Sequence, residues 1–245
     1  MPKNQRSQST EPVKLQIAKY LKTESIKILG RIVNSSNATL LVEVASQAPK
    51  MQAIYKPLAG ERPLWDFSPG LYKREVAAYQ LSEALGLGFV PVTVEREDLP
   101  YGLGSLQYFI DADFSKTYYE IIEDHGNHPR LIEIAAFDIL ANNSDRKGGH
   151  ILIDKQGRIF AIDNGLCFHE EFKLRTVIWE FGNARLSPQF LSSLQEARED
   201  NFAFLTSYLS TAEINSLTAR ADFLLERGSL FDLPEDQRPY PWPII

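Results

Sequence analysis

The feature that most constrains this chain is a polar loop carrying one aspartate, followed by a β-hairpin that ends in a second aspartate. The loop spans residues 142–150, reads Asn-Asn-Ser-Asp-Arg-Lys-Gly-Gly-His, and follows an apolar stretch of helical spacing. Apolar runs on either side of a Lys-Gln-Gly turn predict the hairpin over residues 151–162. Because a hairpin returns the chain close to its starting point, Asp145 and Asp163 are predicted to converge on one site.

Two aspartates brought together in this way suit phosphoryl transfer from a nucleotide. That reaction needs a carboxylate that orients the attacking hydroxyl, and oxygen ligands that hold Mg²⁺ against the nucleotide phosphates. An isolated pair such as Asp145-Arg146 is more often a solvated turn or a surface ion pair. Its place between a helix and a hairpin that ends in Asp-x-Gly favours the functional interpretation.

The predicted elements divide the chain into a β-rich half and a helical half. In the first half, helices are predicted over residues 13–21 and 73–85, and strands over 25–33, 38–45, 52–55, 89–94 and 104–110. After Asp111 the predicted helices cover residues 118–125, 129–142 and 187–228, apart from the hairpin. We therefore expect a disordered N-terminus over residues 1–12 and two packed lobes, an N-lobe over 13–110 and a C-lobe over 111–245.

The stretch from Asp145 to Gly165 resembles two loops of the phosphatidylinositol 3-/4-kinase superfamily. Those loops read Asp-Arg-His-x-x-Asn and, past a hairpin, Asp-Phe-Gly. Here Asp145-Arg146 matches the first pair, and Asp163 and Gly165 match the ends of the second. A Pro-Leu-Trp-Asp-Phe segment and a Tyr-Pro-Trp-Pro tail resemble a bacterial group of phosphatidylinositol kinase-like proteins, so the resemblance covers nearly the whole chain.

The resemblance implies a fold, a cofactor and a set of site residues. The fold is α+β and bilobal kinase-like, with a five-stranded antiparallel N-lobe containing one helix and a mainly helical C-lobe, and ATP with Mg²⁺ or Mn²⁺ lies in the cleft between them. The implied catalytic residues are Asp145, Arg146 and Lys147, with Arg146 as a cation that orients the loop. The implied metal ligands are Asp163 and His150. Because His150 stands where lipid kinases have a metal-binding Asn, it either ligates the metal or contacts phosphate.

A kinase also needs a lysine on the third strand and a glutamate on the helix that follows. Lys56 ends the third predicted strand, and Glu75 lies in the first turn of the helix predicted over 73–85. Taken alone, Lys56 is typical of a solvated strand end and Glu75 of an acid favoured by the helix dipole. Together with Asp163 they predict a Lys-Glu pair that holds the nucleotide phosphates.

Further nucleotide contacts are expected in the turn after the first strand and along the fifth strand. Serine hydroxyls would cover the phosphates, and the backbone of the fifth strand would meet adenine as the hinge. Asp111 either bonds the ribose hydroxyls or caps the next helix. The residues expected to bind the nucleotide, beyond Lys56 and Glu75, are Ser35, Ser36, Gln107, Tyr108, Phe109, Ile110 and Asp111.

Composition excludes several other classes of protein. The net charge of −6 argues against general binding of nucleic acid, which needs a basic surface. The single cysteine, Cys167, allows no intramolecular disulfide and suits a reducing cytoplasm. No apolar run is long enough to predict a transmembrane segment. We expect a cytoplasmic protein, and a monomer.

Three functional hypotheses follow. The first is an ATP-dependent phosphotransferase, an atypical small kinase that transfers the γ-phosphate to a hydroxyl of a protein or small molecule. The second is a phosphatidylinositol or other lipid kinase. The segment of residues 166–179 carries only Lys173 and Arg175 as cations, fewer than a polyphosphorylated head group usually requires. The third is a nucleotide-binding pseudokinase that acts through partners, although Asp145, Asp163 and Lys56 argue for catalysis.

Overall fold

The computed structural model describes three stretches of the chain: residues 11–33, 37–45 and 50–245. Within them the chain forms two compact units. The first unit holds the described residues up to Val76 together with Pro91–Phe109, and the second holds Ala77–Val90 and Ile110–Ile245. The predicted N-lobe, residues 13–110, includes residues 77–90, which here belong to the second unit. The division into two lobes stays a prediction.

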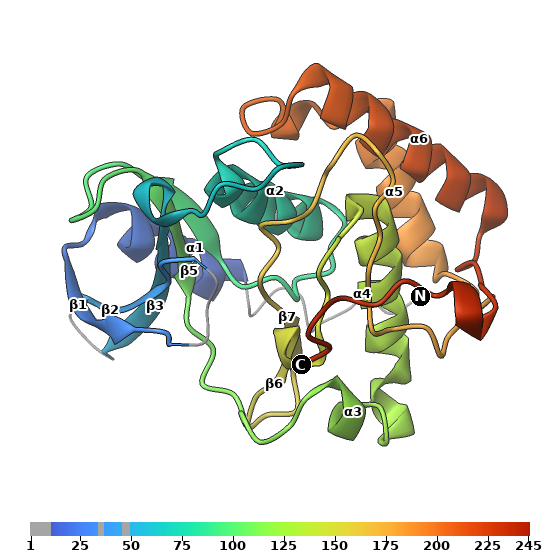
Figure 1. Cartoon of the computed structure of the whole chain (residues 1–245), viewed down its shortest axis with the longest axis horizontal. Coiled ribbons are helices and arrows are strands. Elements are labelled where there is room, and N and C mark those ends of the chain that lie inside the picture. Colours follow the sequence, from blue (N-terminus) through green and yellow to red (C-terminus); the bar gives the residue numbers. More distant parts are fainter. Residues whose placement is uncertain (1–10, 34–36, 46–49) are drawn as a thin grey trace. The chain divides into compact units, whose positions relative to one another are not determined.

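The first unit is built on a five-stranded antiparallel sheet with the strand order β1-β2-β3-β5-β4 (Figure 1). Its strands are β1 (Ile26–Arg31), β2 (Leu40–Val44), β3 (Met51–Pro57), β4 (Thr93–Arg96) and β5 (Gly104–Tyr108). Every second residue of β2 and β3 is buried, which is the alternation of a sheet packed on one face. The predicted five-stranded antiparallel sheet is confirmed.

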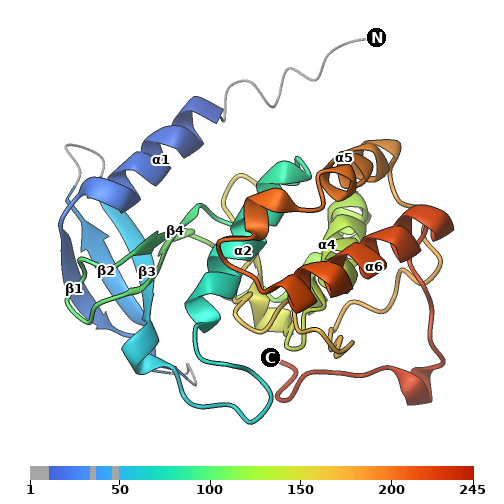
Figure 2. The same ribbon diagram turned by 90° about the horizontal axis from the view of Figure 1, so that it is seen from above.

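Helix α1 (Glu11–Thr23) packs against β4 and β5 (Figure 2). Arg96 of β4 fixes the end of this helix, because its guanidinium donates to the carbonyl oxygens of Leu21 and Glu24 at 3.1 and 2.6 Å. The helix begins inside the stretch predicted to be disordered, residues 1–12. Residues 1–10 lie outside the described part of the chain.

The strand predicted over residues 89–94 begins only at Thr93. Phe89 and Val90 are buried in the core of the second unit, where they form no strand. A short apolar run cannot distinguish a buried connection from a strand, because both bury every residue. The strand predicted over 104–110 likewise ends at Tyr108, two residues early.

The second unit is mainly helical, with one short hairpin. Its elements are α3 (Tyr118–Ile121), α4 (His128–Ala141), the hairpin strands β6 (Ile151–Ile153) and β7 (Ile159–Ala161), α5 (Pro188–Glu199) and α6 (Thr211–Arg227). Helix α2 (Leu71–Ala84) spans both units, and its residues from Ala77 onward belong to this one. Helix α6 contacts both α4 and α5, and all three contribute to one apolar core (Figure 2).

Caps explain where the helices of the second unit begin and end. Thr117 with Glu120 and Ser210 with Glu213 form capping boxes at the starts of α3 and α6. The region predicted as helical over 187–228 is divided between α5 and α6, because Asn201 and Phe202 adopt left-handed backbone conformations. No helix in the described part of the chain is long and apolar enough to cross a membrane.

Candidate functional site

The loop of residues 142–150, hereafter the Asp145 loop, leaves helix α4 through a sharp left-handed turn at Asn142. The backbone of Asn142 has φ 52°, a conformation that asparagine tolerates better than most residues. Its amide donates to the carbonyls of Asp138 and Ile139, and the amide of Asn143 donates to Asp138 as well. This cap ends α4 and directs the next residues toward the hairpin.

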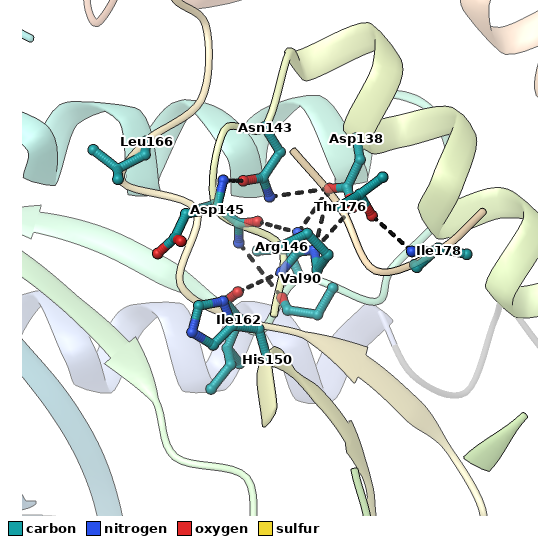
Figure 3. Close-up of polar contacts among 12 residues, drawn as sticks. Val90, Asp138, Asn143, Asp145, Arg146, His150, Ile162, Leu166, Thr176 and Ile178 are labelled. Atoms are coloured by element: carbon teal, nitrogen blue, oxygen red, sulfur yellow. Dashed lines mark hydrogen bonds and ion pairs between the residues drawn. The ribbon is translucent and has the colours of Figure 1, made fainter. Parts of the chain in front are cut away.

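A buried ion pair between Arg146 and Asp138 fixes the Asp145 loop (Figure 3). Both side chains are completely buried, and Arg146 donates from Nε and Nη2 to the two carboxylate oxygens at 3.0 and 2.9 Å. Burial opposes the charge on Arg146, but the attraction of Asp138 outweighs it and raises the Arg146 pKa. The same guanidinium donates to the carbonyl of Ile162 and to Oδ1 of Asn164, at 2.6 and 2.7 Å. Arg146 therefore ties the loop to the end of the hairpin.

Asp145 is held at its backbone, and its side chain is 24% exposed. Its amide donates to Oδ1 of Asn143 at 3.0 Å, and its Oδ2 lies 3.1 Å from Nζ of Lys147. Burial raises the pKa of Asp145, the cation of Lys147 opposes this, and the charge of Asp163 adds to it. The carboxylate thus holds a proton more readily than an exposed aspartate, which suits a group that accepts or orients one.

Asp163 lies two residues after the end of β7 with φ 58°, and its side chain is 49% exposed. A left-handed conformation at a non-glycine residue costs free energy and is found preferentially at functional sites. Nε2 of His150 lies 3.3 Å from Oδ2 of Asp163, and the amide of Ile162 donates to the carbonyl of His150. The hairpin therefore brings Asp163 to the Asp145 loop, the convergence that the sequence predicts.

Lys56 and Glu75 form an ion pair in the first unit, as predicted from their places on β3 and α2. Glu75 is nearly fully buried, whereas the Lys56 side chain is 22% exposed. Strand β5 lies close to β3 beside Lys56, and only glycine fits at Gly104, because a Cβ at that position would lie 2.4 Å from the carbonyl oxygen of Lys56. The pair thus presents one partly accessible cation on a rigid strand.

The other residues predicted to bind the nucleotide have varied surroundings. Gln107 is buried, and its Nε2 donates to Oγ1 of Thr93. The amides of Tyr108 and Phe109 donate to the carbonyls of Val92 and Gln52, so neither is available to adenine. Ile110 is buried. In the second unit Asp111 forms an exposed ion pair with Lys155 at 2.8 Å. Ser35 and Ser36 lie outside the described residues.

Three asparagines of the site were not singled out from the sequence. Asn143 links Asp145 to Asp138, and Asn164 accepts from Arg146. Asn142 donates to the carbonyls of His169 and Glu171 and accepts from the amide of Lys173. The available signal was the Asn-Asn-Ser run directly after an apolar helix, which is typical of side chains that bond nearby backbone.

Among the described residues, no group of three or more His, Cys, Asp or Glu side chains could hold a metal ion. Mg²⁺ bound together with a nucleotide usually takes one or two protein carboxylates and completes its shell with phosphate oxygens and waters. The half-exposed carboxylate of Asp163 suits such a site. Nδ1 of His150 accepts from the amide of Lys147 at 3.4 Å, and its Nε2 faces Oδ2 of Asp163.

The chain matches known proteins over most of its length. A family model described as phosphatidylinositol 3- and 4-kinase matches residues 64–213. Protein Rv2133c of Mycobacterium tuberculosis is 36% identical over 256 residues, which cover 89% of this chain and 91% of that protein. Phosphatidylinositol 4-kinase gamma 4 of Arabidopsis thaliana is 28% identical over 190 residues, which cover 63% of this chain but 32% of that protein.

Two solved structures are similar in fold. A structure of hydra Fam20 with sugar has a TM-score of 0.60 at 13% identity, and the match covers 89% of this chain and 88% of that one. The crystal structure of the golgi casein kinase has a TM-score of 0.56 at 14% identity, covering 91% of this chain and 81% of that one. At such low identities these likenesses bear on the fold alone.

Proposed function

Because the chain belongs to the phosphatidylinositol 3- and 4-kinase family, we propose that Asp145 and Asp163 carry the transfer of a γ-phosphoryl group from ATP to a hydroxyl of a polypeptide or small molecule. The protein is an atypical kinase with a kinase-like α+β fold, and ATP-dependent phosphotransfer is the reaction of its family. The proposal concerns the residues that perform the reaction, the metal, and the acceptor.

The position of Asp145 carries this proposal. In the proposed reaction the bond between the γ-phosphorus and the β,γ-bridging oxygen breaks, and a bond forms from the acceptor oxygen to phosphorus. The acceptor proton passes to the Asp145 carboxylate, and ADP leaves. A fixed amide and a raised pKa prepare Asp145 for this role. Lys147 lies close enough to Asp145 to offset negative charge on the transferred group.

The nucleotide phosphates would be bound by Lys56, whose position Glu75 fixes through the buried ion pair. Asp163 would hold Mg²⁺ or Mn²⁺, and such an ion neutralises charge on the β- and γ-phosphates. His150 would act through Asp163 and not on the metal, because its Nε2 lies 3.3 Å from the Asp163 carboxylate and its Nδ1 accepts from the amide of Lys147. We therefore assign His150 as a positioning residue for Asp163.

The acceptor is better matched by a polypeptide or small molecule than by a phosphoinositide. The segment of residues 166–179 exposes the carboxylates of Glu170 and Glu171. Of its two cations, the Lys173 side chain is only 14% exposed and lies 3.3 Å from the His169 ring, which leaves Arg175 exposed. Such a surface repels a polyphosphorylated head group. A lipid acceptor remains the second candidate, because the plant relative is a phosphatidylinositol 4-kinase.

Turnover of ATP with Mg²⁺ or Mn²⁺ tests the proposal, measured as phosphate transfer to a casein and histone mixture and to phosphatidylinositol vesicles. We expect transfer to protein, and a loss of about 10²–10⁴-fold in Asp145→Asn. Asp163→Asn should lose metal-dependent turnover, and Asp222→Asn on the surface of α6 serves as the matched control. Transfer only to vesicles would favour the lipid kinase. Binding of ATP with metal but no turnover in any arm would identify a pseudokinase.

A further inference from the structure

The last residues of the chain follow the Asp145 loop closely. The amide of Gly148 donates to the carbonyl of Ile244 at 2.8 Å, and the amide of Thr176 donates to the carbonyl of Pro239 at 3.3 Å. Figure 1 shows this part of the chain, drawn in red, ending beside the hairpin of β6 and β7. All of these residues belong to the second unit. The 239–244 segment is thus bound at both ends by main-chain hydrogen bonds.

The two anchoring amides belong to residues near Asp145. Gly148 is three residues beyond Asp145 in the sequence, so it lies within about 10 Å of it along the chain. Thr176 pairs with Arg146, the next residue after Asp145, through a short parallel bridge. An acceptor hydroxyl must come within hydrogen-bond reach of Asp145, so a polypeptide that carries it would pass near Gly148 on the same loop.

The 239–244 segment has the properties of a bound peptide. It carries no charged side chain, and its carbonyl oxygens accept from the loop as any extended peptide could. Pro241 is buried, whereas the Trp242 side chain is 88% exposed. At Gly148 a Cβ would meet the ring of Tyr119 at 3.1 Å and the carbonyl oxygen of Ile244 at 3.7 Å. The missing side chain at Gly148 therefore makes room for an aromatic ring and a peptide backbone.

We propose that the 239–244 segment occupies the peptide-binding part of the acceptor site and inhibits the kinase in cis. This inference rests on the proposed function and deepens it, because it identifies the acceptor as an extended polypeptide that competes for the amides of Gly148 and Thr176. A lipid head group cannot replace two main-chain carbonyls separated by five residues. Release of the segment opens the site.

Cleavage of the folded protein tests this inference without requiring a truncated chain to fold. A specific protease site inserted after Gln237, in an exposed turn, allows the segment to be cut and removed by gel filtration. Phosphate transfer from ATP to the casein and histone mixture should rise about tenfold on cutting, because the fraction of open acceptor sites rises. Wild-type protein treated with the same protease is the control.

A synthetic peptide of residues 239–245 should inhibit the cut protein competitively with the acceptor and not with ATP. Half-inhibition is expected about tenfold below the millimolar effective concentration of a tethered segment, because a tenfold rise on cutting means that the tethered segment fills about nine sites in ten. Equal transfer by cut and uncut protein would overturn the inference while leaving the proposed function in place. No transfer by either form, with protein or with vesicles, would instead remove the proposed function and this inference with it.

Two substitutions in the intact chain provide an independent comparison. Pro241→Asp places a charge at the buried position of the segment, so it should release the segment and raise transfer to the same extent as cutting. Trp242→Asp changes the neighbouring exposed residue, and it should leave transfer at the wild-type level. Equal effects of the two substitutions would contradict a segment held through its buried side.

Discussion

Arg146 and Asp138 show how much of this site depends on residues that never reach solvent. Their buried ion pair supports the backbone on which Asp145 stands, and the guanidinium also holds the hairpin end. Removing one partner of a buried pair leaves the other charge uncompensated. Arg146→Met should therefore lower the free energy of unfolding by about 3–5 kcal/mol, measured by urea denaturation.

The matched control for Arg146→Met is Arg198→Met. Arg198 also forms a two-point ion pair, with Asp222, but the two side chains are 41% and 49% exposed. Loss of that exposed pair should lower the free energy of unfolding far less, because solvent screens it. Equal losses in the two variants would show that burial of Arg146 contributes nothing to its role.

The pKa of Asp145 predicts a pH dependence. Burial raises it above the usual 3.8 and Lys147 opposes the rise, and we take the unprotonated carboxylate as the active form. Activity should therefore fall as the pH drops through a value above 3.8. In Lys147→Met the opposing cation is absent, so the acidic limb of kcat/KM should move to higher pH. Arg198→Met should leave the limb in place, and an unmoved limb in Lys147→Met would contradict the assignment of Asp145.

At the scale of elements, Asn142 joins the end of α4 to the segment that follows Asp163. Its side chain makes three hydrogen bonds to the backbone of residues 169–173, and its backbone is left-handed. Asn142→Ala should lower the free energy of unfolding by about 2–4 kcal/mol, because alanine makes none of these hydrogen bonds and tolerates a left-handed backbone poorly. Glycine tolerates the left-handed backbone, so Asn142→Gly should lower the free energy of unfolding less than Asn142→Ala does. It also lacks the side-chain hydrogen bonds, so residues 169–173 should be cleaved by protease as readily as in Asn142→Ala.

Asn201→Ala is the control for that prediction, because Asn201 shares the left-handed backbone at an exposed position between α5 and α6. It should lower stability through the left-handed backbone and the loss of one exposed hydrogen bond from Thr218, and it should leave residues 169–173 protected. Unchanged proteolysis of that segment in both Asn142 variants would contradict the role of the side chain.

The ion pair between Lys56 of β3 and Glu75 of α2 leads to a separate prediction about ATP binding. Glu75→Gln removes the charge that fixes Lys56, so kcat/KM for ATP should fall roughly 10²-fold through misplacement of the cation. Glu43→Gln disrupts the neighbouring ion pair with Lys50, whose side chain is exposed, and should leave ATP kinetics unchanged. Wild-type ATP kinetics in Glu75→Gln would show that nucleotide binding does not depend on the ion pair.

The elements were largely predictable from sequence because they follow local patterns. Strands β2 and β3 alternate buried and partly buried residues, and Lys56 and Glu75 follow from the order of strand and helix. The partners of Asn142 could not be predicted, because they lie 27 to 31 positions away and no periodicity connects them. Phe89 and Val90 have the pattern of a strand, but the core of the second unit buries them instead.

At the scale of the whole molecule, residues 77–90 belong to the core of the second unit, so that unit needs them in order to fold. Phe89 stacks edge-on against Phe137 of α4 with ring centroids 5.3 Å apart, and its carbonyl accepts from the amide of Ala161. Arg130 donates to the carbonyl of Leu87 at 2.8 Å. This stretch therefore packs on both the main helix and the hairpin that carries Asp163.

A fragment of residues 111–245, cut at the predicted lobe boundary, should fail to fold cooperatively. It lacks seven core residues, among them the large side chains of Leu81, Leu85, Leu87 and Phe89. Each contributes about 1.5–3 kcal/mol when buried, so the loss is comparable to the roughly 5–15 kcal/mol that stabilises a typical domain. A second fragment, in which residues 77–90 are joined to 110–245 by a Gly/Ser linker, restores those side chains and should unfold in one cooperative transition. Thermal unfolding followed by near-UV circular dichroism compares the two, and cooperative unfolding of 111–245 alone would show that residues 77–90 are dispensable.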